Sequence, residues 1–297
     1  MLLAATHNGS FHADDVFAFA ILKAATNGAL SLTRSRQSTD WQAAAVVFDV
    51  GAVFDPANGR YDHHMRDKPL RPSGEAYSSA GLVWLDYGRQ AIAHLFPTAT
   101  AGQIEMVWGK LDQGLLRDID LMDNGAMERH PGHFSTLLEA YNPTFAEIGA
   151  DEDVAYHQAV AVAETVLART ISHALAGAIA RDAVALAAAK AEDPRIIVLD
   201  TRLPWDDAVF DLGLETVLYV VRPAGRDWTV SAVPPERGSF GQRLSLPDAW
   251  GGLREQELVA VCGVADATFC HSARFVCGAL SREGAVAMAR LAVTSGG

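Results

Sequence analysis

The sequence predicts an α/β protein: a mostly parallel sheet with flanking helices, then a second, smaller α/β or α+β domain. Three observations support this. Short apolar runs alternate with helical patterns near the N-terminus, a long alanine-rich helical stretch follows, and the chain becomes β-rich after Glu192-Asp193-Pro194. We therefore expect a first domain over residues 1–150, a helical connector over 151–191 and a C-terminal domain over 192–297.

The predicted N-terminal elements follow a strand, helix, strand, strand order. Met1–Ala5 is a short apolar strand, and the helix after it begins with Asp14 and Asp15, where carboxylates suit the positive helix end. That helix ends at Asn27-Gly28, and the next two strands are predicted at Leu30–Thr33 and Ala45–Val50. This order favours parallel pairing, which places the carboxyl ends of the strands at one edge of the sheet.

The remaining elements are mostly helical before residue 192. Ser78 and Ser79 can cap a helix running to about Leu95. The other predicted helices span about 102–122 and 151–190, the latter with a break near Gly177. The C-terminal part has strands expected at 195–199, 216–221 and 228–233, and helices at 253–259 and 283–292.

Composition and charge exclude several classes of protein. With 297 residues, 49% of them hydrophobic and 20% charged, the chain is globular in composition. Its net charge of −12 disfavours an extended grip on duplex DNA. The N-terminus lacks a signal-peptide pattern, and charged residues and histidines interrupt the alanine-rich stretch, so we expect a cytoplasmic protein without a membrane span. General base rates favour a homodimer.

The three cysteines form no Cys-x-x-Cys pair. Cys262, Cys270 and Cys277 all lie within apolar stretches. We expect buried, reduced thiols, with a redox or zinc role as the alternative.

The first functional cluster follows the first predicted strand. His7, His12 and Asp14 lie in one strand-to-helix loop, whose residues can converge on a common point. Taken alone, the same residues could be an ordinary polar helix N-terminus.

Three further sets of polar residues occur at ends of predicted elements. Asp49 ends a strand, and Asp62-His63-His64 follows a turn. Asp120 and Asp123 lie where a helix closes before Asn124-Gly125, and the sequence does not decide which of the two belongs with the others. Each set alone could be a turn, a cap or a solvated loop.

Together, these four segments predict a site for two divalent metal ions. They offer carboxylates and imidazoles but no thiolate, which suits manganese, magnesium or cobalt better than structural zinc, although zinc remains possible. Two ions about 3.5–4 Å apart can activate a water and stabilise the displaced oxygens of a phosphoester. The residues therefore predict a metal-dependent hydrolase, with phosphoesters as the leading substrate class.

The motifs also resemble a known family. Four segments are similar to the melanocyte-proliferating-gene family of metal-dependent hydrolases. They are Thr6-His7-Asn8-Gly9-Ser10-Phe11-His12, Tyr61-Asp62-His63-His64, Asp120 to Gly125, and the stretch from Trp250-Gly251-Gly252-Leu253-Arg254 through His271 to Arg282-Glu283-Gly284-Ala285. That family is related to the DHH phosphoesterase superfamily. The resemblance implies a DHH-phosphoesterase-like fold with a two-metal centre at the edge of the N-terminal sheet.

The resemblance also implies a role for each residue. One ion would be held by His7, His12 and Asp49, and the other by Asp14, Asp49, His63 and Asp123, with Asp49 bridging the two. His64 would face the substrate as a general acid or phosphate contact, and Asp62 would orient an imidazole.

Three residues near the C-terminus are candidates for substrate binding. His271 follows a strand-like run, and Arg274 and Arg254 carry guanidinium groups that can pair with a phosphate in a two-pronged arrangement. The alternative for each arginine is an ordinary surface position.

The resemblance implies a 3′–5′ exonuclease acting on RNA or short oligonucleotides, and the predicted metal site would supply a water activated by two metal ions. The first alternative keeps the metal ions but hydrolyses a small phosphoanhydride, such as pyrophosphate. The second is a binding protein that metal ions stabilise and that turns over no substrate.

Overall fold

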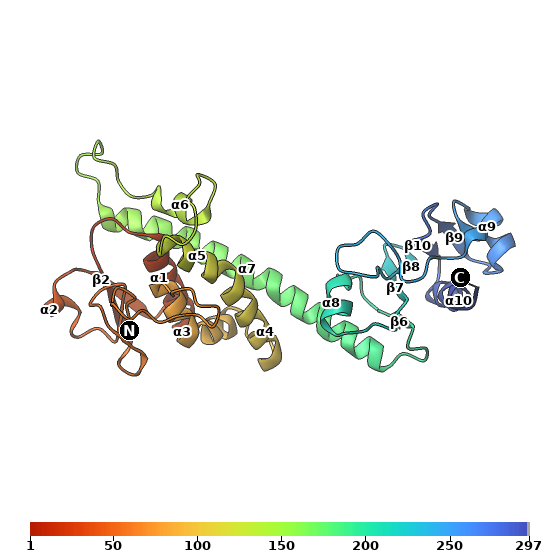
Figure 1. Ribbon diagram of the computed structural model, residues 1–297, viewed down its shortest axis with the longest axis horizontal. Helices are drawn as coiled ribbons and strands as arrows, with labels where there is room; N and C mark the ends of the chain where they lie inside the picture. Colours follow the sequence, from red (N-terminus) through yellow and green to blue (C-terminus); the bar gives the residue numbers. More distant parts are fainter. Residues whose placement is uncertain (296–297) are drawn as a thin grey trace. The chain divides into compact units, whose positions relative to one another are not determined.

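The computed structural model describes residues 1–295 of the chain (Figure 1). It contains two compact units, one from Met1 to Leu175 and the other starting at Ala176. Each unit has its own five-stranded sheet, which confirms the expected mixed α/β class. The domain ranges 1–150, 151–191 and 192–297 remain predictions.

The sheet of the first unit has the strand order β2-β1-β3-β5-β4. Parallel pairing joins β1 (Leu2–Thr6) to β2 (Leu30–Arg34) and to β3 (Val46–Phe48), and joins β3 to β5 (Arg60–Tyr61). Only the edge strand β4 (Phe54–Asp55) is antiparallel to its neighbour. The expectation of a mostly parallel sheet is therefore correct, whereas two-residue strands such as β4 and β5 leave no periodic pattern to predict them.

Helices pack around this sheet. The helix α1 (Ala13–Ala25) is buried along most of its length and packs against α3 (Ser79–Leu95). The expected helix over 102–122 consists of α4 (Ala101–Leu111), a π-helical turn (Asp112–Leu116) and α5 (Arg117–Asp123). Two short helices, α2 (Ser38–Trp41) and α6 (Phe134–Glu139), and a 3-10 turn (Pro56–Asn58) complete the elements before α7.

The longest helix is α7, which runs from Glu152 to Ala189 without interruption. The predicted break near Gly177 is wrong. A glycine costs a helix only about 1 kcal/mol relative to alanine, and alanine-rich flanks with high helix propensity offset that cost.

By length and composition, α7 could cross a membrane, since one 18-residue window has a mean hydropathy of 1.3. Core helices of soluble proteins reach the same values. In the first unit α7 buries Tyr156, Val160 and Leu167, and 33% of the 18-residue window is buried. Length and hydropathy alone therefore do not indicate a membrane span.

The sheet of the second unit has the order β6-β7-β8-β10-β9. β6 (Ile196–Val198) pairs parallel with β7 (Tyr219–Ala224). The other pairs are antiparallel: β7 with β8 (Asp227–Ala232), β8 with β10 (Val276–Ala279), and β10 with β9 (Ala267–Cys270). The helices are α8 (Asp206–Asp211), α9 (Glu255–Cys262) and α10 (Arg282–Ser295), with a 3-10 turn at Asp248–Trp250. All three cysteines are free and buried in this unit, as expected.

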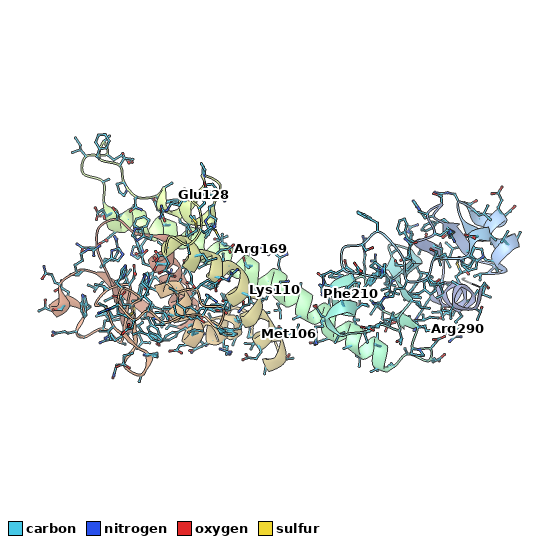
Figure 2. All side chains as sticks on the ribbon, in the orientation of Figure 1. Met106, Lys110, Glu128, Arg169, Phe210 and Arg290 are labelled. Atoms are coloured by element: carbon cyan, nitrogen blue, oxygen red, sulfur yellow. The ribbon has the colours of Figure 1, made fainter. Side chains whose placement is uncertain are left out.

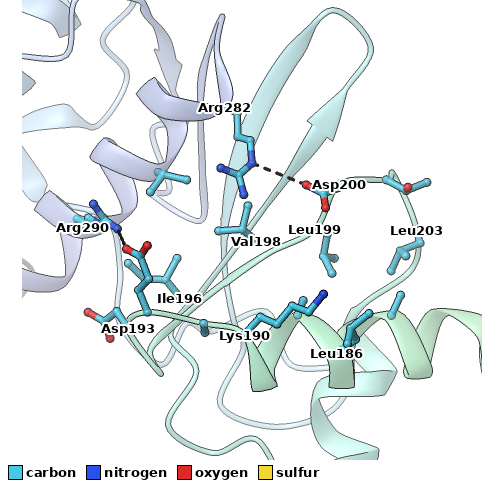
Figure 3. A pocket seen from close by; sticks show the side chains of 16 residues that line it. Leu186, Lys190, Asp193, Ile196, Val198, Leu199, Asp200, Leu203, Arg282 and Arg290 are labelled. Atoms are coloured by element: carbon cyan, nitrogen blue, oxygen red, sulfur yellow. Dashed lines mark hydrogen bonds and ion pairs between the residues drawn. The ribbon is translucent and has the colours of Figure 1, made fainter.

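A cavity of about 410 Å³ lies in the second unit, between the end of α7, β6 and α10 (Figure 3). Ion pairs between Arg282 and Asp200 (3.7 Å) and between Arg290 and Glu192 (2.5 Å) lie at its walls. Arg282, from the last of the quoted family motifs, lines this cavity, but no predicted metal, catalytic or substrate-binding residue does.

Candidate metal centre

The loop between β1 and α1 carries the first two histidines. His7 directly follows β1, and His12 is the N-cap of α1, where its backbone N–H donates to Asp15 Oδ1 (2.9 Å). Asn142, 131 residues later, fixes this loop through both backbone groups of Phe11. Its side-chain oxygen accepts from Phe11 N (2.9 Å) and its amide donates to Phe11 O (2.8 Å).

Asp49 lies between two imidazoles. One of its carboxylate oxygens, Oδ2, is 3.1 Å from His7 Nε2, and the other, Oδ1, is 3.3 Å from His63 Nε2. The Asp49 backbone has a φ of 54°, a left-handed conformation that a residue other than glycine adopts at some cost. The turn after β3 thus directs this carboxylate into the centre of the site.

His63 is also close to two other carboxylates. Its Nε2 lies 3.2 Å from Asp123 Oδ2 and 3.7 Å from Asp14 Oδ2. Four overlapping groups offer ligand atoms within 4.8 Å of one another: His7, His12 and Asp49; His12, Asp14 and Asp123; Asp14, Asp15 and Asp49; and Asp49, Asp62, His63 and His64. We call these nine residues the metal cluster. The structure thus brings together every sequence-predicted residue of the N-terminal region.

Several buried polar atoms of the metal cluster lack a hydrogen-bond partner. They are Asp14 Oδ1, Asp15 Oδ2 and both ring nitrogens of His63. Leaving such atoms unpaired inside a protein is costly, and a bound cation removes that cost for oxygen and imidazole lone pairs. The donor set therefore fits divalent metal ions.

The pKa values show how crowded the carboxylates are. Burial and then the charges of neighbouring carboxylates raise the pKa of Asp14, and burial with the charge of Asp49 raises the pKa of Asp15 to about 8. For Asp49, burial acts in the same direction, but the close contacts of its carboxylate with the imidazoles of His63 and His7 outweigh burial and lower the pKa. Burial lowers the pKa of His7, yet Asp49 and Asp15 raise it more strongly.

Asp62 and His64 form a hydrogen-bonded pair at the rim. Asp62 Oδ1 lies 2.8 Å from His64 Nδ1 and also accepts from His63 N (2.7 Å), while Oδ2 accepts from Ala52 N (2.5 Å). The bond to Asp62 raises the pKa of His64 despite partial burial. Because the His64 side chain is 60% exposed and Asp62 is buried, the geometry fits one exposed imidazole oriented by one buried carboxylate.

Asp120 belongs to a different network, so Asp123 is the helix-end carboxylate of the metal cluster. Asp120 accepts from Arg71 Nε (2.7 Å) and from Ser78 through N (3.0 Å) and Oγ (2.7 Å). Asp112 accepts from Arg71 Nη1 (3.0 Å). Burial raises the pKa of Asp120 to about 6, against the opposing effect of Arg71.

Two further residues at this site were not predicted to belong to it: Asp15, a member of the metal cluster, and Ser79, which hydrogen-bonds to it. Asp15, which ends the first segment rich in histidine and aspartate, was not among the predicted metal ligands, yet its side chain lies with Asp14 and Asp49. Ser79, predicted only as a cap, donates its Oγ–H to Asp49 Oδ1 (3.1 Å) and its N–H to Asp14 Oδ2 (3.3 Å). The adjacent pairs Asp14-Asp15 and Ser78-Ser79 were the available signals.

The three substrate-binding candidates lie in the second unit. His271 is exposed, its Nδ1 accepts from Ala273 N (3.1 Å), and its ring packs on Phe275. Arg274 donates to Leu246 O (3.1 Å) and pairs with Asp248, so its guanidinium is engaged locally. Arg254 is the N-cap of α9. Their role in substrate binding remains a prediction.

Comparison with known proteins identifies related sequences over nearly all of the chain. The model of MYG1_exonuc, described as "Uncharacterised protein family (UPF0160)", matches residues 3–293. The MYG1 exonuclease of Bos taurus is 33% identical over 96% of this chain and 83% of its own length, and that of Homo sapiens is 31% identical over 96% and 84%. Among solved structures, RecJ from Thermus thermophilus in complex with Mn²⁺ gives a TM-score of 0.26 at 15% identity, covering 99% of this chain and 52% of RecJ.

Proposed function

Because this chain belongs to the MYG1_exonuc family, whose mammalian members are named exonucleases, we propose that it is a metal-dependent phosphodiesterase that removes nucleotides from the 3′ end of RNA or short oligonucleotides. The observation that carries the proposal is the convergence of His7, Asp49 and His63 with the other metal-cluster residues at one edge of the first sheet.

The residues divide between the two proposed ions as follows. His7, His12 and Asp49 would hold one ion, and Asp14, His63 and Asp123 would hold the other together with Asp49. The two oxygens of Asp49 face different imidazoles, which supports a bridging role. Two bound divalent ions, manganese being our first choice, would activate a water and stabilise charge on the phosphoryl oxygens.

His64 supplies the proton that the reaction needs. Its Nδ1 is directed to the Asp62 carboxylate, which leaves Nε2 to face solvent and substrate. A raised pKa increases the protonated fraction of the imidazole near neutral pH, so Nε2–H can protonate the leaving oxygen, O3′ of the shortened chain, as the P–O bond breaks. Asp62 holds the ring orientation and stabilises its positive charge.

We propose a cytoplasmic enzyme, acting as a homodimer, that takes short single-stranded RNA or nucleotide phosphoesters. Neither duplex DNA nor a membrane is a proposed partner. The net charge of −12 supports a preference for short substrates, because an acidic surface repels a long polyanion.

A substrate panel tests this function. The protein is incubated with Mn²⁺ and oligoribonucleotides labelled at the 5′ end, dinucleotides or pyrophosphate. A ladder of products shortened one nucleotide at a time is expected. Release of orthophosphate from pyrophosphate alone would overturn the exonuclease in favour of a phosphoanhydride hydrolase. Metal binding without turnover of any substrate would favour a binding protein.

A further inference from the structure

We propose that Arg36 is a substrate-binding residue whose guanidinium engages a phosphate of the substrate beside the metal cluster. This inference rests on the proposed phosphodiesterase function. Neither the motifs of the sequence nor the metal cluster itself includes Arg36.

Strand pairing places Arg36 beside His7. β1 and β2 are parallel, with Thr6 opposite Arg34, and Ser35 N continues the ladder by donating to Thr6 O (2.8 Å). His7, directly after β1, and Arg36, two residues after β2, therefore emerge together at the carboxyl edge of the sheet. Arg36 Nη2 lies 3.3 Å from His7 Nδ1.

The backbone around Arg36 is well fixed although its side chain is exposed. Ser35 is buried, donates its Oγ–H to Asp40 Oδ2 (2.5 Å) and accepts from Gln37 N (3.0 Å). The guanidinium is thus presented at the site from a rigid turn, which lowers the entropy lost when it binds a ligand.

The neighbouring Arg34 is engaged in structural contacts. It donates to Gly9 O (2.6 Å), pairs with Asp153 (2.7 Å) and lies 4.4 Å from the centre of the Tyr156 ring. Among the described residues, Arg36 has no such set of protein partners. Its guanidinium can therefore leave His7 and bind a phosphate instead. His7 Nδ1 also lies 3.1 Å from Asn8 O, so when Nδ1 carries the proton it bonds to that carbonyl and not to Arg36.

The charge balance of the metal cluster favours a cationic side chain beside it. The buried part of the metal cluster contains the carboxylates of Asp14, Asp15, Asp49 and Asp62, with Asp123 half-buried beside them. These five negative charges more than match two divalent ions, so the filled centre has no surplus positive charge for a phosphodiester. His12, His64 and Arg36 are exposed cationic or titratable groups next to these carboxylates. Arg36 is permanently cationic and can bind two phosphate oxygens at once.

The test measures binding without turnover. The probe is a fluorescent five-nucleotide RNA with hydrolysis-resistant phosphorothioate linkages, and its anisotropy is followed in Mn²⁺. Since a hydrogen bond to a charged group contributes about 1.5–3 kcal/mol, Arg36→Ala should weaken binding about 10- to 100-fold. Arg36→Lys should bind with intermediate affinity, because it keeps the charge but not the two-pronged geometry.

A matched control is Arg169→Ala, which removes an exposed arginine on α7 (Figure 2) and should leave the dissociation constant unchanged. Metal content and melting temperature are measured for every variant. Unchanged probe binding in Arg36→Ala would overturn the inference. So would a loss of bound metal in that variant, because Arg36 would then serve only to hold His7.

The two proposals can fail separately. If the wild-type protein binds the probe through Arg36 but shortens no RNA, the exonuclease proposal fails and Arg36 remains a phosphate-binding residue. If the wild-type protein shortens RNA and Arg36→Ala leaves both KM and probe affinity unchanged, the exonuclease proposal stands and the proposal for Arg36 fails. A wild-type protein that neither binds nor cleaves overturns both.

Discussion

His7 Nε2 lies 3.1 Å from Asp49 Oδ2, although 42 positions separate the two residues in the chain. The contact exists because β1 and β3 are parallel neighbours, with Ala4 opposite Val46 and Ala5 opposite Val47. The residues that follow the two strands therefore meet at one edge of the sheet. The metal cluster depends on this pairing, because three of its four overlapping groups include Asp49.

Asp49→Asn should abolish hydrolysis while the fold survives. The substitution keeps the shape of the side chain but removes the negative charge that lies between two imidazoles. Metal affinity should therefore fall by at least about 10- to 100-fold, which is the loss typical when a residue that only hydrogen-bonds to a metal ligand is replaced. Elemental analysis and circular dichroism check this, with the exposed Asp118→Asn as control. Unfolding of the variant, instead of loss of metal, would contradict the prediction.

Removal of metal should make stability depend on pH through Asp15. Its pKa is raised from 3.8 to about 8 in the metal-free fold, so between these values the folded protein holds a proton that the unfolded chain has released. The free energy of unfolding of metal-free protein should therefore fall as pH rises through this window. Asp15→Asn should flatten the dependence.

Metal binding should reverse that trend, because cations displace the proton from the carboxyl group. Adding Mn²⁺ should raise the melting temperature more at about pH 8 than at about pH 6. Thermal unfolding at the two pH values, with and without EDTA, measures the difference. A larger effect at the lower pH would contradict the prediction.

Asp120 and Asp123 should respond in opposite ways to removal of their charge. Asp123→Asn should reduce bound metal with little loss of stability, since Asp123 faces His63 in the metal cluster. Asp120→Asn should cost about 3 kcal/mol, because the buried Arg71 loses a charged partner, and should leave the metal content unchanged. Urea unfolding and elemental analysis separate the two, and loss of metal in both would show that Asp120 also supports the centre.

Asn142 should control metal affinity from a distance. Asn142→Ala leaves both backbone groups of Phe11 without their partner, at a cost of about 1–3 kcal/mol, and loosens the loop that carries His7 and His12. Weaker Mn²⁺ binding is expected in titration calorimetry. The control Asn58→Ala removes an exposed side chain whose bond is to Asp55, and it should bind metal normally.

Gly81 and Gly177 should give opposite results when replaced by alanine. A Cβ at Gly81 would lie 2.5 Å from Asp120 Oδ2, and Asp120 is held on both sides, so we expect a loss of about 1–3 kcal/mol. At Gly177 a Cβ meets nothing within 4 Å, and the higher helix propensity of alanine should stabilise α7 by up to about 1 kcal/mol. Thermal unfolding compares the two, and equal effects would contradict the close approach of α3 to Asp120.

The second sheet shows where sequence patterns were insufficient. Runs at 195–199, 216–221 and 228–233 were predicted and correspond to β6, β7 and β8. β10 was not predicted, because Val276–Ala279 is short and contains a glycine. β10 pairs with β9 just before it and with the much earlier β8, where Val276 lies opposite Ser231, and local periodicity does not encode the pairing with β8.

The sequence by itself determined the α/β class, the family and the ligand types, because strand ends, imidazoles and carboxylates are local features that a motif preserves. Only the tertiary structure decided that Asp123 and not Asp120 joins His63, that Ser79 supports Asp49, and that Arg36 lies beside His7. Each of these depends on which strands and helices become neighbours. That choice is made by packing between distant segments, so no single stretch of the chain contains it.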